Sequence, residues 1–147
     1  MKISKEKFEE LKRQAIENDR IAKESFFTLK EKVFNSNSLL DADGYPTDDA
    51  LSLVEIWHHS DIKGLFDFIY HLWNLKSFGW HSENGGVDDW NKMEIPETTT
   101  RYHLSTAGWS GNESIIRSLE ENTDIWDEIW VQSRRGGHYI FEVKNED

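Results

Sequence analysis

The sequence of 147 residues contains no cysteine, only two prolines, and far fewer basic than acidic residues. Without cysteine the chain cannot form a disulfide, a thiolate nucleophile or a zinc site of the cysteine type, which agrees with a reducing compartment. It also lacks any run of about 18 apolar residues, and the charged segment after Met1 has no apolar stretch of the kind that signal peptides carry. We therefore expect a cytoplasmic protein that is neither exported nor membrane-spanning.

The scarcity of basic residues gives a formal net charge of −11, from 17 Lys and Arg against 28 Asp and Glu. Because such a charge repels phosphate, direct binding of DNA or RNA is not expected. The acidic excess is largest in residues 35–100, which hold twelve acidic and three basic side chains. This segment either forms an acidic surface for a basic partner or keeps a small protein soluble.

Aromatic residues are abundant, with seven Trp, eight Phe and four Tyr, and they are sufficient to build the core of a single folded domain. The first segment, residues 1–34, is predicted to be one helix from Ser4 to about Phe34, because apolar side chains recur at intervals of three and four and Ser4 can cap the helix. The apolar stripe consists of Phe8, Leu11, Ala15, Ala22, Phe26, Leu29 and Val33. Such a helix packs on the rest of the chain, which we favour, or mediates a homodimer.

Residues 47–75 are predicted to form a pair of helices. Thr47 caps a helix that runs to about His59, and Ser60 caps a second helix that runs to about residue 75. Adjacent residues on a helix point about 100° apart, so we expect His58 and His59 not to share a ligand. We predict no metal site and no cofactor.

Residues 77–97 contain three glycines and one proline, and they are predicted to form a long loop that acts as a lid or packs against the body. Residues 98–144 are predicted to form a β-α-β-β unit. Its first strand is 98–105, and its helix begins at a capping box of Ser110 and Glu113.

The last two strands of this unit, 128–134 and 138–143, flank a Gly-Gly turn signal. The pairs Ile125 with Ile129 and Trp126 with Trp130 also fit a short helix, which is an alternative for the start of this segment. The predicted fold class is therefore α+β, with a helical amino-terminal half followed by a small antiparallel sheet of about three strands and one inserted helix, in the order α-α-α-β-α-β-β.

A two-residue turn at the two glycines decides which hairpin side chains share a face, because side chains alternate along a strand. It places aliphatic side chains on the face that suits a helix layer and aromatic and polar side chains on the other, and a three-residue loop would exchange the two. The aromatic face is typical of an interface, unless the long first helix covers it as a second core layer. The candidate binding residues are Trp130, Gln132, Arg134, Arg135, His138, Tyr139 and Phe141, together with Trp109.

Two blocks in the carboxyl-terminal third carry a family resemblance. They are Gly-Trp-Ser-Gly-Asn-Glu at 108–113 and Arg-Arg-Gly-Gly-His-Tyr-Ile-Phe-Glu at 134–142. Through their order and spacing the chain resembles a group of small uncharacterised bacteriophage proteins. The resemblance implies a phage or prophage origin and a setting in the host cytoplasm, and it brings no catalytic residues.

We predict no catalytic residues and interpret the chain as a non-enzymatic accessory binding protein of phage type. In this interpretation an aromatic or acidic surface inhibits a host or defence protein. One alternative is a protein that sequesters a small anionic nucleotide signal, with Arg134, Arg135 and His138 near the ligand. A structural role in the virion is another.

A further alternative is a phosphodiester hydrolase that uses His103 and His138. The segment His103-Leu104-Ser105 resembles one H-x-[ST] element of the two-histidine phosphoesterases. The second element is incomplete, because Ile140 stands where a hydroxyl is needed.

Overall fold

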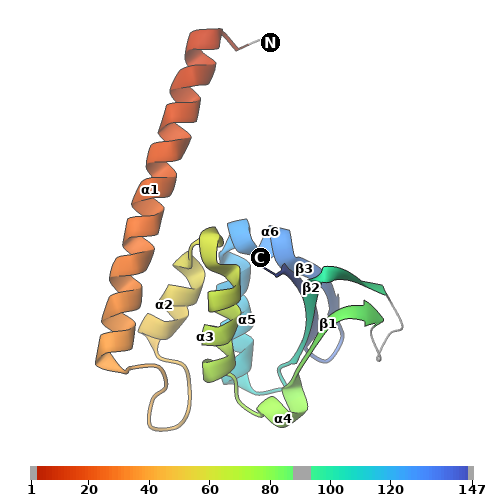
Figure 1. The fold of residues 1–147 in the computed structure, drawn as a ribbon. Helices are drawn as coiled ribbons and strands as arrows, with labels where there is room; N and C mark the ends of the chain where they lie inside the picture. The colour runs from red at the N-terminus through yellow and green to blue at the C-terminus, as the bar shows by residue number, and fades with distance from the viewer. Residues whose placement is uncertain (1–2, 88–93, 146–147) are drawn as a thin grey trace.

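The computed structural model describes residues 3–87 and 94–145. Its elements, in chain order, are α1 (Lys5–Ser36), α2 (Asp48–Ile56), the 3-10 turn η1 (His59–Asp61), α3 (Ile62–Leu72), α4 (Lys76–Gly79), β1 (Trp80–Val87), β2 (Glu94–Ser105), α5 (Ser110–Glu121), α6 (Thr123–Ile129), β3 (Trp130–Arg134) and β4 (His138–Lys144). The strands form one antiparallel sheet in the order β1-β2-β4-β3. Helices α3, α5 and α6 cover one face of the sheet, α2 packs on α5, and α1 is outermost (Figure 1). The predicted α+β fold with a helical amino-terminal half is confirmed.

The core lies between the sheet and the helices that cover it. The ring of Phe66 on α3 stacks on Tyr102 of β2 with 4.5 Å between ring centroids and meets Phe141 of β4 edge-on at 5.7 Å. Leu104 and Val143, two residues further along these strands, are buried in the same cluster. Because alternate strand residues share a face, β2 and β4 turn one aromatic and aliphatic row toward the helices.

The sheet has a fourth strand, β1, where the sequence predicted a loop over 77–97, and that prediction is wrong. Trp80 to Asn84 pair with Thr100 to Leu104 of β2, and a bulge separates Asn84 from Gly86. At the bulge Gly85 has a φ of 48°, and a Cβ there would lie 3.3 Å from the backbone of Glu97. The glycines therefore bend the strand against its partner rather than end it. Residues 88–93 of the predicted loop lie outside the described residues.

Helix α1 begins and ends as its sequence indicates, but it packs on the body over only part of its length. The Ser4 side chain accepts a hydrogen bond from the Lys7 N–H at 3.1 Å, which confirms the predicted cap. Residues 5–25 are exposed, and only Phe26 and Val33 are buried, so the helix projects beyond the body (Figure 1). The favoured expectation that it packs along the chain is wrong for this part, because α2 is nine residues long and supports only the carboxyl-terminal turns. A homodimer through α1 stays a prediction.

The predicted capping box at the start of α5 is also wrong. The helix starts at Ser110 itself, and its N-cap is Trp109, which makes no side-chain cap hydrogen bond. Gly111 has no room for a side chain, because a Cβ there would lie 2.2 Å from the Trp109 ring. Asn112 makes the polar contacts that hold the amino-terminal end of α5.

Asn112 is fully buried and joins α5 to the segment that follows α3. Its carbonyl accepts the Asn74 N–H at 2.9 Å, and its amide donates to the Asn74 carbonyl at 2.9 Å and to the Thr106 carbonyl at 3.4 Å. One side chain therefore satisfies three backbone groups from two segments.

We expect Asn112→Ala to lower the free energy of unfolding by about 2 kcal/mol, because it leaves the Asn74 backbone groups without their partner. The matched control is Ser114→Ala two residues further along α5. The Ser114 hydroxyl donates only to the Ser110 carbonyl of its own helix, and its loss should cost less than about 0.5 kcal/mol. Urea denaturation of both variants tests this, and equal losses would contradict the proposed clamp.

Candidate functional site

The hairpin of β3 and β4 turns through three residues, since Arg134 pairs with His138. The prediction of a two-residue turn is therefore wrong, and the two faces of the hairpin are exchanged relative to that prediction. Phe141 is 0% exposed, and Trp126 of α6 lies 5.4 Å from it and 6.4 Å from Tyr139 between ring centroids. The aromatic residues of β4 thus face the helices, and α6 rather than α1 covers them.

The other candidate binding residues of the hairpin are exposed. Arg134 donates through Nε to Gln132 at 3.1 Å, and these two residues share the outer face of the sheet with His138. Trp130 and Arg135 are also exposed, whereas Trp109 stacks on Tyr45 with 4.8 Å between ring centroids. The structure therefore gathers the polar members Gln132, Arg134 and His138 on the outer face, whereas Tyr139 and Phe141 lie together on the inner face.

The outer face of the sheet carries a buried polar network. Arg101 is 3% exposed and donates through Nε to Glu142 at 3.1 Å, and His81 lies 3.0 Å from Glu83 between Nε2 and Oε1. His81 stands opposite His103 in the register of β1 and β2, with 5.7 Å between the ring centroids. His81 is not among the residues predicted from the sequence, because residues 77–97 were predicted to form a loop.

His103 and His138, the pair of the hydrolase alternative, project from this same outer face. His103 pairs with Ile140, whereas His138 pairs with Ser105. The two histidines are therefore diagonal neighbours on adjacent strands, a separation of about 7–8 Å between backbone positions.

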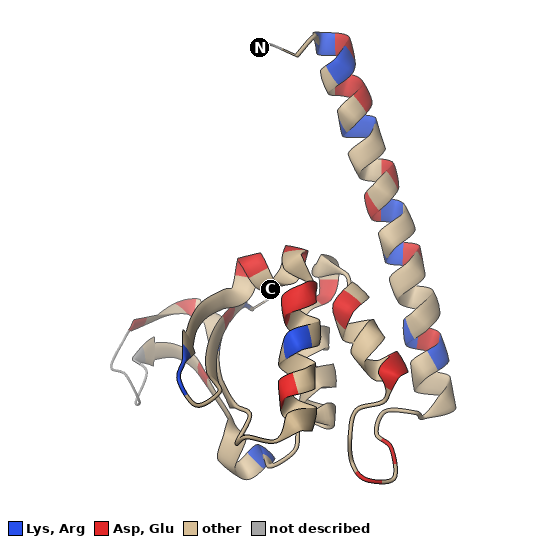
Figure 2. Ribbon diagram, turned by 180° about the vertical axis from the view of Figure 1, so that it is seen from behind, with Lys and Arg blue, Asp and Glu red and all other residues tan. Residues whose placement is uncertain are grey.

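Exposed acidic side chains gather on α2, α5 and α6, which lie next to one another on the side of the molecule seen in Figure 2. Residues 110–129, which include α5 and α6, hold six acidic side chains and one basic side chain. We name this surface the acidic face, and it consists of Glu55, Glu113, Glu120, Glu121, Asp124, Asp127 and Glu128. Burial, and then the charges of Glu120 and Glu113, raise the pKa of Tyr139 on β4.

Four of these acids stand where they weaken their own helices. Glu120 and Glu121 lie in the last turn of α5, and Asp127 and Glu128 lie in the last turn of α6. Neither last turn contains a basic residue. A negative charge near a helix carboxyl terminus is unfavourable by roughly 0.3–1 kcal/mol, and Asp124 with Glu128 adds a like-charge pair four residues apart.

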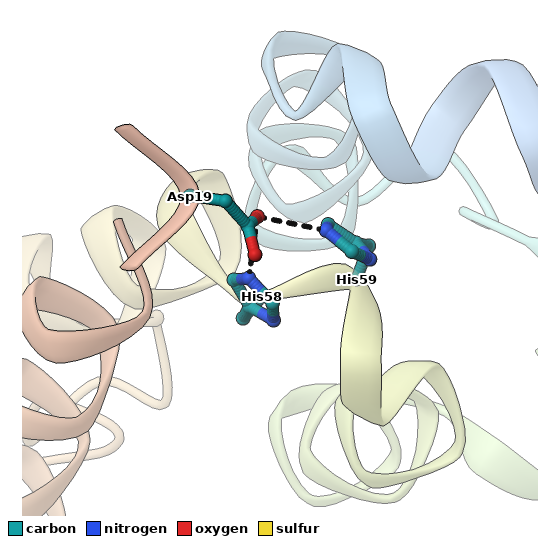
Figure 3. Close-up of side chains that lie close together, drawn as sticks. All are labelled: Asp19, His58 and His59. Carbon is teal, nitrogen blue, oxygen red and sulfur yellow. Dashed lines mark hydrogen bonds and ion pairs between the residues drawn. The ribbon is translucent and has the colours of Figure 1, made fainter. Parts of the chain in front are cut away.

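A cluster of Asp19, His58 and His59 lies at the edge of the acidic face, where α1 crosses the corner between α2 and α3 (Figure 3). Helix α2 ends at Ile56, and His58 is extended with a ψ of 140°. The rings of His58 and His59 lie 4.2 Å apart between centroids, and Nε2 of each is 2.9 Å from Oδ1 of Asp19. The prediction that the two histidines point apart is wrong, because it assumed that α2 continues through them.

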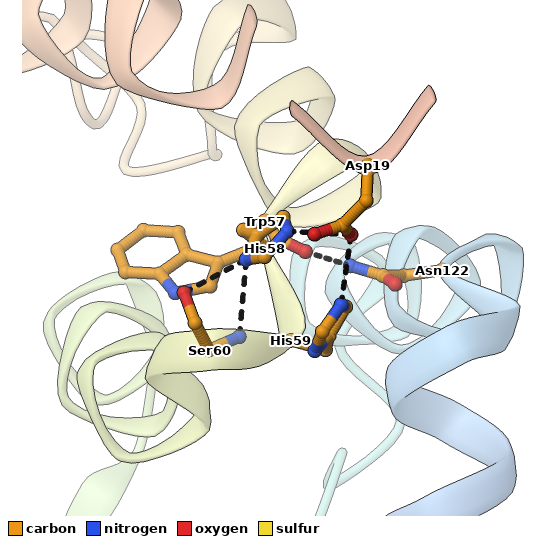
Figure 4. A network of polar contacts seen from close by, with 6 residues as sticks. All are labelled: Asp19, Trp57, His58, His59, Ser60 and Asn122. Carbon is orange, nitrogen blue, oxygen red and sulfur yellow. Dashed lines mark hydrogen bonds and ion pairs between the residues drawn. The ribbon is translucent and has the colours of Figure 1, made fainter. Parts of the chain in front are cut away.

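Hydrogen bonds from two neighbouring segments hold this corner in place (Figure 4). Nδ1 of His58 lies 2.7 Å from the Ser60 hydroxyl, and the Trp57 indole donates to the Asp61 carbonyl at 2.8 Å. Asn122, between α5 and α6, donates to the Trp57 carbonyl at 3.0 Å. The backbone on both sides of His58 is therefore anchored, and its side chain is 5% exposed.

The cluster opens onto a cavity of about 250 Å³ that Glu55 and Asp124 also line. Hydrogen bonds from His59 and His58 hold the pKa of the Asp19 carboxyl below its ordinary value of 3.8, because N–H donors stabilise the carboxylate. Within residues 3–87 and 94–145, Asp19, His58 and His59 are the one group whose donor atoms lie close enough to hold a metal ion, all within 4.8 Å of one another.

Comparisons of the chain with protein-family models, curated proteins and solved structures find no match.

Among the helices that the structure describes, none combines the length and the apolar character needed to cross a lipid bilayer.

The lowered pKa of Asp19 predicts a pH-dependent contribution to stability. A carboxyl whose pKa is lower in the folded than in the unfolded state stabilises the fold above its unfolded pKa, and the contribution is lost as the pH falls through the folded pKa. We therefore expect Asp19→Asn to be less stable than the wild type at about pH 6, with a difference that shrinks below about pH 4. Urea unfolding across this range in metal-free buffer measures it.

The control for this experiment is Asn18→Ala, which changes the neighbouring residue of α1 without removing a titratable group. The difference in the free energy of unfolding between Asn18→Ala and the wild type should not vary with pH. A difference for Asp19→Asn that is equally constant would show that the carboxylate does not bind the two histidines.

Proposed function

We propose that the chain is a non-enzymatic binding protein that presents its acidic face to a basic surface of a protein partner. The observation that carries this proposal is the placement of Glu120, Glu121, Asp127 and Glu128 in the last turns of two helices, where they oppose helix stability. Natural proteins break such local stability rules at functional or strained sites. If these acids served only to keep the protein soluble, they could lie equally well elsewhere on the helices.

The resemblance of the carboxyl-terminal third to bacteriophage proteins supports a more specific form of the proposal. The partner is then a host or defence protein whose basic surface binds nucleic acid, and the acidic face takes the place of the phosphates. The exposed Trp130, Arg134 and His138 of the hairpin are a second group of candidate contacts.

The acidic face is tested by comparing two triple variants that change the net charge equally. One is Glu120→Gln, Glu121→Gln and Glu128→Gln on the acidic face, and the other is Glu6→Gln, Glu9→Gln and Glu10→Gln at the exposed start of α1. We expect the first variant to have an affinity about tenfold or more lower for a partner captured from bacterial lysate. The affinity of the second variant should stay within about twofold of the wild type. Quantitative affinity capture at several salt concentrations measures both.

Duplex DNA added as a competitor should release the captured partner, because the proposal places both on the same basic surface. Equal binding by the two triple variants, or capture that neither salt nor DNA weakens, would contradict a role for the acidic face.

A second candidate function is phosphodiester hydrolysis, and the observation that favours it is the arrangement of His81, His103 and His138 on one sheet face. It predicts turnover of bis(p-nitrophenyl) phosphate that is abolished in His138→Ala, an exposed position where the fold should tolerate the change. The control is His71→Ala, another exposed histidine on α3. Absence of turnover in the wild type would eliminate this candidate and leave the binding proposal untouched.

A further inference from the structure

We propose that Asp19, His58 and His59 form a binding site for a divalent transition-metal ion of the zinc class. The three donor atoms come from α1 and from the corner that follows α2, and they lie within 4.8 Å of one another. Nε2 of each histidine is 2.9 Å from the same carboxylate oxygen, so both rings already point to one place.

The donor set selects the class of ion. Two imidazole nitrogens and one carboxylate oxygen suit Zn²⁺, Co²⁺, Ni²⁺ or Fe²⁺, whereas Ca²⁺ and Mg²⁺ prefer oxygen ligands only. Three protein ligands also leave one position of a tetrahedral ion for water or another ligand. The cavity beside the cluster provides the space, and the carboxylates of Glu55 and Asp124 on its wall favour a cation.

Two of the three distances among the donor atoms are close to those around a tetrahedral ion. Zinc lies about 2.0–2.2 Å from nitrogen and oxygen ligands, so tetrahedral ligands are about 3.3 Å apart. The two contacts of 2.9 Å must therefore open by a few tenths of an ångström. Asp19 and His59 have side chains that are 50% and 47% exposed, so both are free enough to make this movement.

The Ser60 hydroxyl gives His58 the neighbour that a metal-bound imidazole needs. A histidine that binds a metal through Nε2 carries its proton on Nδ1 and donates it to a neighbouring acceptor, which fixes the ring. In this structure Nδ1 of His58 accepts the Ser60 backbone N–H at 3.2 Å and lies 2.7 Å from the Ser60 hydroxyl. Binding of the ion at Nε2 moves the ring proton from Nε2 to Nδ1, where a donation to the Ser60 hydroxyl replaces the contact with the Ser60 N–H, and the ion takes the place of the proton between His58 and Asp19.

This site would bind the ion between two parts of the chain that are 39 residues apart. The ion would fix α1 to the body at a point well before the buried contacts of Phe26 and Val33. Metal binding should therefore raise the melting temperature, in proportion to the logarithm of the ion concentration above the dissociation constant.

The experiment uses the full chain without a histidine tag, titrated with Co²⁺ and with Zn²⁺ after treatment with a chelator. We expect one equivalent of Co²⁺ to produce the visible absorption band of a tetrahedral site, Zn²⁺ to displace it, and Zn²⁺ to raise the melting temperature. The variants Asp19→Asn and His59→Gln change exposed side chains, and each should weaken binding at least tenfold. His71→Gln on α3 is the matched control and should bind within twofold of the wild type.

Circular dichroism of the metal-free variants establishes that each is folded before titration. Absence of the Co²⁺ band in the folded wild type would overturn the proposal and leave the cluster as a hydrogen-bonded latch. Binding that is unchanged in Asp19→Asn and His59→Gln would overturn it equally, because the ion would then lie elsewhere.

Discussion

The hydrogen bonds of the Asn122 amide are the constraint on which the arrangement of the helices depends. This buried side chain donates to the carbonyls of Val54 at 2.9 Å and Trp57 at 3.0 Å at the end of α2. The Val54 carbonyl also accepts the Trp57 N–H at 3.4 Å, whereas the Trp57 carbonyl would cost about 1–3 kcal/mol if it were buried without a hydrogen bond. Because Asn122 also lies between α5 and α6, one amide ties the end of α2 and the adjoining histidine corner to the junction of the two acidic helices.

The two faces of the sheet contribute differently to folding. The inner face contributes hydrophobic burial, and the outer face contributes to the strand register. The inner face buries aromatic rings, and their contacts tolerate small displacements. On the outer face, the register places Arg101 between Glu83 of β1 and Glu142 of β4. A slip of β1 by one residue would put Ser82 or Asn84 opposite Arg101, and it would turn the row of Trp80 away from the helices. We infer that the ionic face specifies the register, whereas the aromatic face supplies most of the stability.

The parts of the fold that could be predicted from the sequence are those that local chemistry determines. The Ser4 cap and the three- and four-residue spacing define α1, and alternation with a glycine turn defines the hairpin. The predictions fail where residues far apart in the sequence determine the local structure. No glycine or proline follows Ile56 before Gly64, and α2 ends where Asn122, a residue distant in the sequence, takes the Trp57 carbonyl. The histidine cluster was missed for this reason. Which hairpin side chains share a face depends on whether the turn has two or three residues. The composition of the turn does not determine this length.

The exposed part of α1 has a mechanical consequence. Residues 5–18 precede Asp19, and at 1.5 Å per residue they form a rod of about 21 Å beyond the histidine corner. A rotation of 10° about that corner would move the tip of the rod by roughly 4 Å, a distance comparable to the width of a side chain. Any rotation of α1 at the histidine corner is therefore enlarged at the amino-terminal end of the helix in proportion to the length of this rod.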